Sequence, residues 1–304
     1  MPTEQFIATM LRAAVPIILV AMGGVFAWRA GIFHLGLEGL MIIGAFGGVA
    51  GTVWTGTWIG GILVAVVASM IASAIFWFVI VKLRADPIIA GLGLTGLGLG
   101  GAAFALNTIF NQRGAIILDQ GLPRPISGVN EGLGVILSEQ SILIWATPFL
   151  VLLCWVILKR TRFGLRLSAV GEYPFAARSV GADPDRIRFV ALVVGGIFCG
   201  LGGAELSLGS LSSFSEAMTQ GRGFIAFTAV LLGAGDPIGA AFAGLFFGFT
   251  DALGIQSQLA STGVIPREFV LMLPYVVTII AVWISGIWQR RSLDAAAGFV
   301  ELRE

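Results

Sequence analysis

The stretch "WIGGILVAVVASMIASAIFWFVIV", Trp58–Val81, decides the fold class of this chain. It holds 24 consecutive residues with no charged side chain, and Lys82 and Arg84 follow directly after it. A helix that crosses the hydrocarbon core of a bilayer needs about 20 apolar residues. The stretch therefore predicts a transmembrane helix, with basic residues marking its end.

The composition of the whole chain agrees with this stretch. Hydrophobic residues make up 57% of the 304 residues and charged residues 12%, whereas about a quarter of a soluble domain is charged. The apolar runs are continuous rather than alternating, which favours helices over a barrel. We predict an all-α polytopic membrane protein with a single transmembrane domain over residues 1–304. Its seven full transmembrane helices are expected at Ala13–Ala27, Leu35–Val53, Trp58–Val81, Ile88–Thr108, Ile142–Leu158, Phe189–Leu208 and Phe269–Trp288.

Two shorter apolar runs, Phe224–Ala234 and Ile238–Ile255, lie between the last two of these spans. A helix of about 11 residues rises only about 16 Å. The runs therefore predict either a re-entrant hairpin that enters from the outer face or two further short spans. The break between them is "GAGDP", which includes Asp236.

Aspartate followed by proline occurs at 86–87, 183–184 and 236–237. Aspartate can cap the free N–H groups of a helix start, and proline is favoured at the first helical position. The three pairs therefore predict helix starts. For Asp236, a functional role in a break at membrane depth is the alternative.

The basic residues predict how the chain is oriented. Residues 159–188 carry seven of the 18 lysines and arginines, and such residues gather on the cytoplasmic side of membrane proteins. We expect this loop and the C-terminus to be cytoplasmic, the N-terminus and the loop 109–141 to be external, and the protein to be a multi-pass protein of the cell membrane.

The basic loop also contains the segment "GEYPFAARSVGADPDRIR". It predicts a short helix, Pro174–Val180, that proline begins and Gly181 ends. An ordinary positive-inside loop would account for the arginines. It would not account for a bounded helix with the small residues Ala176 and Ala177 among charges, which is typical of a helix that docks on a partner.

Several function classes are excluded by what the sequence contains. The net charge of +1 argues against a nucleic-acid partner, and one histidine with two separate cysteines offers no metal ligand set. No phosphate-binding loop with its lysine is present, so the chain is not an ATPase. The glycines of "GLGLTG", Gly91–Gly96, have the spacing of a dinucleotide-binding loop but lie inside an apolar span, where they indicate close helix packing. The sequence shows no nucleophile paired with a general base that would indicate an enzyme.

Acidic residues inside apolar spans are costly and are functional candidates by default. Glu38, Glu205 and Asp251 form this set, with an interfacial position as the alternative for each. Glu38 lies in "GIFHLGLEGLMIIGAF", Gly31–Phe46, four residues after His34. The two side chains share a face if that segment is helical, and its glycines allow a kink or an unwound turn.

Three stretches together resemble a known family. "GIFHLGLEGLMIIGAF", "TRFGLRLSAVGEYPFAARSVG" and "GRGFIAFTAVLLGAGDPIGA" are similar to the permease subunits of ABC importers for nucleosides and simple sugars, in the group that also contains the branched-chain amino acid permeases. The similarity runs from Gly23 to Arg290, and the chain looks like the smaller permease of the nucleoside branch. His34 stands where the family commonly has asparagine.

The resemblance implies the partners and the role of the basic loop. It implies a second homologous permease in a heterodimer, a cytoplasmic ATP-binding subunit that uses ATP and Mg, and an external substrate-binding protein. This chain itself would hold no cofactor, no metal and no catalytic residue. The coupling helix seated in the ATP-binding subunit would involve Gly171, Glu172, Pro174, Ala176, Ala177, Arg178 and Gly181.

The function expected from these points is ATP-driven, alternating-access passage of a nucleoside or related small solute. A nucleoside path needs aromatic faces for the base and polar groups for the ribose. The candidates, with the phenylalanines expected near the outer mouth, are His34, Glu38, Ser207, Phe214, Phe224, Phe227 and Asp251. A simple sugar or a branched-chain amino acid is the alternative substrate. The alternative mechanism is a proton-coupled secondary transporter that uses Glu38, His34 and Glu205.

Overall fold

The computed structural model describes residues 3–111, 114–118, 121–126 and 140–259, and single positions at 134, 136, 138, 272, 276 and 279. The chain divides into two compact units, residues 1–249 and 250–304. The boundary falls within the last described helix, α11 (Pro237–Leu259). A single domain over the whole chain therefore stays a prediction.

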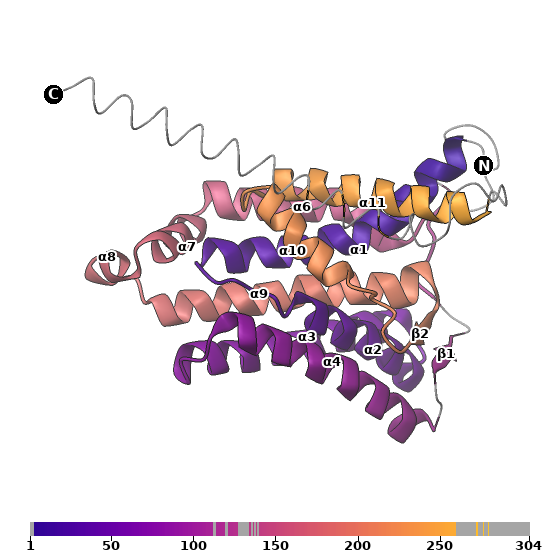
Figure 1. Ribbon diagram of the computed structural model, residues 1–304, viewed down its shortest axis with the longest axis horizontal. Helices are drawn as coiled ribbons and strands as arrows, with labels where there is room; N and C mark the ends of the chain where they lie inside the picture. Colours follow the sequence, from indigo (N-terminus) through magenta and orange to yellow (C-terminus); the bar gives the residue numbers. More distant parts are fainter. Residues whose placement is uncertain are drawn as a thin grey trace. The chain divides into compact units, whose positions relative to one another are not determined.

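The first unit is built almost entirely of helices (Figure 1). Within the described residues, seven helices are long and apolar enough to cross a membrane, as judged by length and composition. The predicted all-α polytopic membrane fold is confirmed. The elements are α1 (Thr3–Arg29), α2 (Leu37–Thr55), α3 (Trp58–Trp77), the π-helical turn η1 (Phe78–Lys82), α4 (Pro87–Phe110), β1 (Ala115–Ile117), α6 (Ile142–Arg160), α7 (Arg162–Glu172), α8 (Pro174–Ser179), α9 (Pro184–Ala204), the π-helical turn η2 (Glu205–Ser210), β2 (Ser213–Ser215), α10 (Arg222–Leu232) and α11.

Six of the seven long helices coincide with predicted spans, and the predicted span Phe269–Trp288 lies outside the described residues. The seventh is α11, which has 23 residues and so is longer than the apolar run that predicted it. It extends beyond Ile255 into polar residues, which hydropathy alone leaves out. Helix α10 has 11 residues, as short as its run implied.

The turn between α10 and α11 lies at the α7 end of the first unit. Arg29 Nε donates a hydrogen bond to the carbonyl of Gly235 at 2.8 Å, and Lys159 Nζ lies 3.2 Å from Asp236 Oδ1. Arg29 ends α1 and Lys159 belongs to the last turn of α6. The prediction of a hairpin from the outer face with its break at membrane depth is therefore wrong. The Asp236 carboxylate and the Gly235 carbonyl both find cationic partners at this basic end of the helices.

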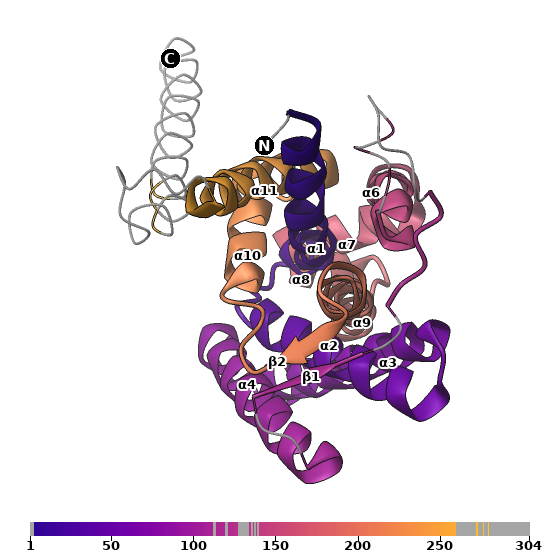
Figure 2. The same ribbon diagram turned by 90° about the vertical axis from the view of Figure 1, so that its right-hand side faces the viewer.

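Helix α9 packs against α1, α2 and α3, which surround it in Figures 1 and 2. Glycines bring these backbones together: a Cβ on Gly23 would lie 2.6 Å from the carbonyl oxygen of Gly195, and one on Gly44 would lie 2.8 Å from Cα of Gly200. The sequence predicts such packing for the glycines of "GLGLTG", Gly91–Gly96, where it is found only in part. In "GLGLTG", Gly91 meets the backbone of Gly36, while Gly96 has nothing within 4 Å.

A small two-stranded sheet lies at the end opposite α7 and α8 (Figure 1). Strands β1 and β2 are antiparallel, with Ile116 opposite Phe214. The all-helical prediction did not include this sheet, because a three-residue strand has no periodic signal of its own. It joins the external loop 109–141 of the prediction to the segment that follows α9.

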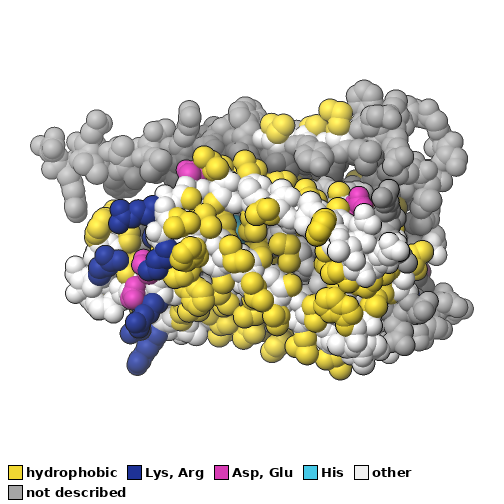
Figure 3. All heavy atoms as spheres, turned by 90° about the horizontal axis from the view of Figure 1, so that it is seen from below, with side chains coloured by type: hydrophobic (Ala, Val, Ile, Leu, Met, Phe, Trp, Pro, Cys, Tyr) yellow, Lys and Arg dark blue, Asp and Glu magenta, His cyan; other side chains and the backbone are white. Residues whose placement is uncertain are grey.

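Basic side chains gather at the other end. In Figure 3 lysine and arginine lie together where α7 and α8 project, and apolar side chains cover the adjoining face. Helices α3 and α4 carry exposed apolar residues, such as Leu63, Ile71, Leu97 and Phe104. The arrangement is that of a helical bundle in lipid with one strongly basic end.

Candidate functional site

The predicted short helix of the basic loop is present as α8. It begins at Pro174 and ends at Ser179, and Gly181 follows with a φ of 82°. Helix α8 is thus one residue shorter than predicted. Its surroundings are unusual for a short connection, because Tyr173 and Val180 are exposed and Phe175 is 85% exposed.

The predicted coupling residues lie together on α7, α8 and the turn after them. Glu172, Ala176, Arg178 and Gly181 are exposed, Gly171 and Pro174 are half-buried, and Ala177 is buried. Ala177 therefore anchors α8, and the other side chains are available for contact. The structure places these residues on one exposed element but does not test what binds there.

Helix α7 rests on the connection between α1 and α2. A side chain at Gly171 would collide with the carbonyl of Arg29 and would lie 3.0 Å from the amide of Gly31. From α9, Arg188 Nε donates to the carbonyl of Ala30 at 3.3 Å. The segment 29–31 is thus in direct contact with the helix that precedes α8.

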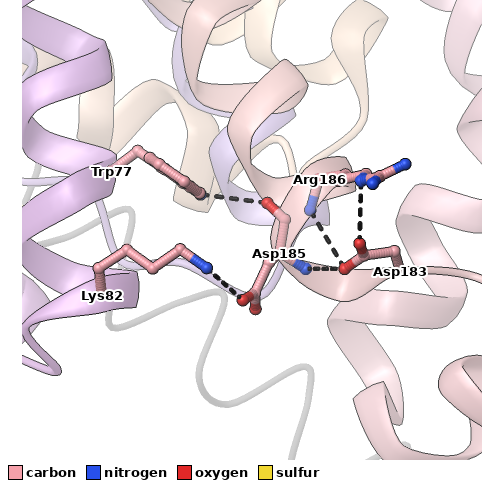
Figure 4. Close-up of polar contacts among 5 residues, drawn as sticks. All are labelled: Trp77, Lys82, Asp183, Asp185 and Arg186. Carbon is pink, nitrogen blue, oxygen red and sulfur yellow. Dashed lines mark hydrogen bonds and ion pairs between the residues drawn. The ribbon is translucent and has the colours of Figure 1, made fainter.

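The start of α9 is tied to the end of α3 (Figure 4). The Asp183 carboxylate caps α9 by accepting from the amides of Asp185 at 3.0 Å and Arg186 at 3.5 Å. Lys82 Nζ lies 3.0 Å from Asp185 Oδ2, and Trp77 Nε1 donates to the carbonyl of Asp185 at 3.1 Å. Because η1 widens the helix between them, Trp77 and Lys82 both reach the same turn of α9.

The other two Asp-Pro pairs are helix starts as well. Asp86 accepts from the amides of Ile88 and Ile89 at 2.8 and 3.1 Å, and Asp236 accepts from Ile238 at 3.1 Å. Partial burial raises the pKa of Asp236, but the hydrogen bonds from Lys159 and from backbone amides outweigh it, so this pKa lies below its ordinary value. The proposed role of Asp236 in an in-membrane break is replaced by a cap paired with Lys159.

Glu38 is buried in the first turn of α2 and faces the start of α10. Its Oε1 accepts from the hydroxyl of Thr219 and from the amide of Gly221 at 3.0 Å. Its Oε2 accepts from the amide of Gly223 at 2.6 Å. The carboxylate therefore serves as the cap of another helix, because the first N–H groups of a helix have no intrahelical partners.

His34 does not share a helical face with Glu38, because residues 32–34 form a non-helical connection and α2 begins only at Leu37. The imidazole is 1% exposed and stacks on Phe76, with ring centroids 4.2 Å apart and planes 4° apart. Neither ring nitrogen has a hydrogen-bond partner within the described residues. The contact of His34 is thus with an aromatic ring of α3.

The other predicted path residues are spread through the molecule. Buried Ser207 donates to the carbonyl of Gly203 at 3.2 Å, and Phe214 packs on Phe46 at the sheet end. Phe227 packs on Phe33 of the α1–α2 connection, and its expected place near the outer mouth stays a prediction.

Phe224 directly follows the Glu38 contact on α10, and Asp251 is half-buried on α11 in the second unit. Within the first unit, the structure does not bring the other six predicted residues to one place. An amphipathic helix buries its apolar side chains whatever their function. Residue type alone therefore does not distinguish aromatic path residues from aromatic core residues.

Glu205 is 0% exposed and begins η2 at the end of α9. Its Oε2 accepts from the Ser141 hydroxyl at 2.6 Å, and the charges of Arg12 and Arg124 act on it. Oε1 has no well-aligned hydrogen-bond partner among the described side chains and backbone groups. Glu205 thus links α9 to α1, α6 and the loop before α6.

Sequence reasoning missed the partners of Glu38. Thr219, Gly221 and Gly223 lie 181 residues or more from it in the sequence. The signal available was "GRGF", in which glycines flank Arg222 at a helix start. Gly221 has a φ of 82°, and a side chain at Gly223 would collide with the backbone of Glu38.

An apolar cavity of about 480 Å³ lies between α1, α6 and the first half of α11. Most of its lining residues are apolar, among them Leu11, Pro148 and Phe242. Gln140 and Thr147 are polar residues of the lining. No predicted path residue lines it. Such a lining offers a nucleoside or sugar too few hydrogen bonds to fix its orientation.

With this architecture in view, comparison with known proteins identifies the family. The family model for the permease component of branched-chain amino acid transport systems matches residues 6–282. The chain belongs to this permease family. The permease is also similar to individual transport proteins. It is 37% identical to the guanosine ABC transporter permease protein NupQ of Bacillus subtilis, over 96% of this chain and 94% of the relative.

Two further relatives support the same placement. The permease is 34% identical to the nucleoside ABC transporter permease protein NupC of Lactococcus lactis, over 91% of this chain and 90% of the relative. It is 33% identical to the putative glucose ABC transporter permease protein TsgC13 of Haloferax volcanii, over 84% and 79%. The predicted resemblance to nucleoside and sugar ABC permeases is confirmed, and the chain is a transport subunit of the cell membrane.

Proposed function

We propose that this permease forms the path for a nucleoside in an ABC importer. The single observation that carries the proposal is α8, an exposed short helix at the basic end with aromatic and aliphatic side chains uncovered. Exposed side chains such as Phe175 are costly in water without a partner. A cytoplasmic ATP-binding subunit, which uses ATP and Mg, is the partner that fits this position.

Three further parts of the proposal follow from the resemblance. The basic end is cytoplasmic, in keeping with the gathering of lysine and arginine there. An external binding protein delivers the solute, and a second homologous permease completes a heterodimer. The scattered positions of the candidate path residues support a path that lies between two permeases rather than within one.

The substrate class rests on the relatives. NupQ and NupC carry guanosine and nucleoside in their names, and both cover more of this chain than TsgC13 does. A nucleoside is therefore the first substrate to test, with glucose and leucine as the alternatives. The nucleotide-driven change of state requires different contacts in the two states, and α8 with α7 is the element that would transmit them.

The test is uptake by proteoliposomes that contain the full transporter. Radiolabelled guanosine should enter only when ATP, the ATP-binding subunit and the binding protein are all present. Uptake that follows a proton gradient without ATP would contradict the proposal and support a secondary transporter. Faster uptake of glucose or leucine would leave the importer but replace the substrate.

The docking role of α8 has its own variant. Phe175→Asp changes a side chain that is 85% exposed, so folding should not suffer. We expect ATP-driven uptake and co-purification of the ATP-binding subunit to fall by about tenfold, as for an aromatic residue at the centre of an interface. Leu83→Asp is the matched control, because Leu83 is 63% exposed in the α3–α4 connection. Equal losses in both variants would contradict docking through α8.

A further inference from the structure

Helix α10 begins inside the bundle with no cap from its own segment. It has 11 residues, and its N-cap residue Gly221 offers no side chain. The free N–H groups of a helix start and the positive end of its dipole favour an anion. Glu38 supplies that anion from α2, and Thr219 adds a third donor to the two amides.

The contact between α2 and α10 at this point is backbone against backbone. A Cβ on Gly223 would collide with Cα and the backbone nitrogen of Glu38. With no side chain between them, the two helix starts approach as closely as they can. The position of the α10 start is therefore set by Glu38 itself.

The turn that follows α10 is held by the connection between α1 and α2. The carbonyl of Gly235 accepts from Arg29, which ends α1, while Glu38 stands just after the start of α2. Gly171 of α7 lies against Arg29 and Gly31. The segment 29–38 thus contacts both ends of α10 and the helix that leads into α8.

We propose that Glu38 is a positioning residue, an internal anionic ligand that fixes the start of α10 and lets movement of the α7–α8 end reach α10. It acts on transport through α10 and does not need to touch the solute. The proposal rests on the proposed function for what drives the movement. It predicts that what matters is a carboxylate at this place rather than its covalent link to α2.

The experiment is chemical rescue in proteoliposomes that contain the complete transporter. In Glu38→Ala the three donors lose their acceptor, and buried donors without partners are costly. We expect maximal uptake to fall about tenfold or more with the KM for the solute little changed. Sodium formate or acetate should restore a large part of it, whereas sodium chloride at the same ionic strength should not.

Two further variants complete the design. Glu38→Gln fills the space and should not respond to formate. Thr219→Val removes one donor and leaves Glu38 in place, so it should lower maximal uptake by a smaller factor, without rescue. If Glu38→Ala does not assemble, Thr219→Val still decides, because wild-type uptake in that variant would overturn the proposal.

Failure of this inference can be told apart from failure of the proposed function. Wild-type vesicles report which energy source drives uptake, and the Glu38 variants are compared with wild type under that same source. Uptake of Glu38→Ala at the wild-type rate, or a loss in an assembled complex that formate and acetate leave unchanged, would overturn the positioning role.

Discussion

Two buried carboxylates lie in the long apolar helices of the permease, Glu38 in the first turn of α2 and Glu205 where α9 passes into η2. Glu38 is held by backbone amides at the start of a helix, whose positions are fixed. Glu205 is held by the Ser141 hydroxyl and by the charges of Arg12 and Arg124. The difference is between a rigid donor set and one that side-chain rotation can rearrange, so only the first can define where a helix begins.

The surroundings of the two carboxylates differ in the same sense. Gly223 meets the backbone of Glu38, which cannot yield unless α2 moves. Gly209 meets the carboxylate oxygens of Glu205, the far end of a flexible side chain. Both glycines are required for close approach, but what they approach decides how a larger residue would be tolerated.

The largest expected effect comes from adding a methyl group at these two glycines. Overpacking against atoms that cannot move costs about 1–3 kcal/mol. We therefore expect Gly223→Ala to lower the unfolding midpoint of the purified permease in detergent clearly more than Gly209→Ala. Gly96→Ala is the control, because a Cβ there has nothing within 4 Å. Equal losses at 223 and 209 would remove the distinction between fixed and movable surroundings.

The next effect, of similar size, is expected from replacing one carboxyl oxygen with an amide nitrogen. In Glu38→Gln the amide group presents its own N–H groups to amide donors, and one buried donor left unpaired costs about 1–3 kcal/mol. In Glu205→Gln the amide oxygen can still accept from Ser141. Denaturation of both variants in the same detergent should give the larger loss for Glu38→Gln. A larger loss for Glu205→Gln would mean that the guanidinium charges, rather than the hydroxyl, hold that side chain.

The smallest effect is expected at Asp236, which precedes the start of α11. Asp236→Asn removes the ion pair with Lys159. The Lys159 side chain is 44% exposed and that of Asp236 32% exposed, and exposed ion pairs contribute about 0–1 kcal/mol to the free energy of unfolding. The pKa of Asp236 is lowered in the folded state, so its stabilisation is complete above the unfolded-state pKa and is lost as the pH falls through the folded-state pKa. Thermal unfolding should separate wild type from the variant at neutral pH and not in strong acid. A difference that persists in acid would show that the cap, not the charge, is responsible.

Local features of the sequence predicted much of this fold. The long apolar runs gave six helices to within a few residues at most ends, since span length depends on hydropathy alone. The Asp-Pro pairs gave three helix starts because capping involves neighbouring residues, and Pro174 and Gly181 bounded α8 for the same reason.

Features that depend on distant contacts were not predicted. The pairing of β1 with β2 and the acceptance of three donors by Glu38 join segments far apart in the sequence. The α10–α11 turn was misplaced because its partners, Arg29 and Lys159, lie on other helices. The roles of the coupling and path residues stay predictions, because they depend on partners and on a solute.

The capping of α10 by Glu38 also sets an order of events during synthesis. Glu38 is synthesised 181 residues before Thr219, so the carboxylate exists before any of its donors. Glu38 lies in the first turn of α2 rather than at its centre, but an ionisable side chain inside the bilayer is still costly without a partner. The nascent α2 must keep Glu38 at the lipid headgroups or beside earlier helices until α10 is made. Helix α10 is too short to integrate unaided, and it supplies the hydrogen-bond donors that Glu38 lacks until then.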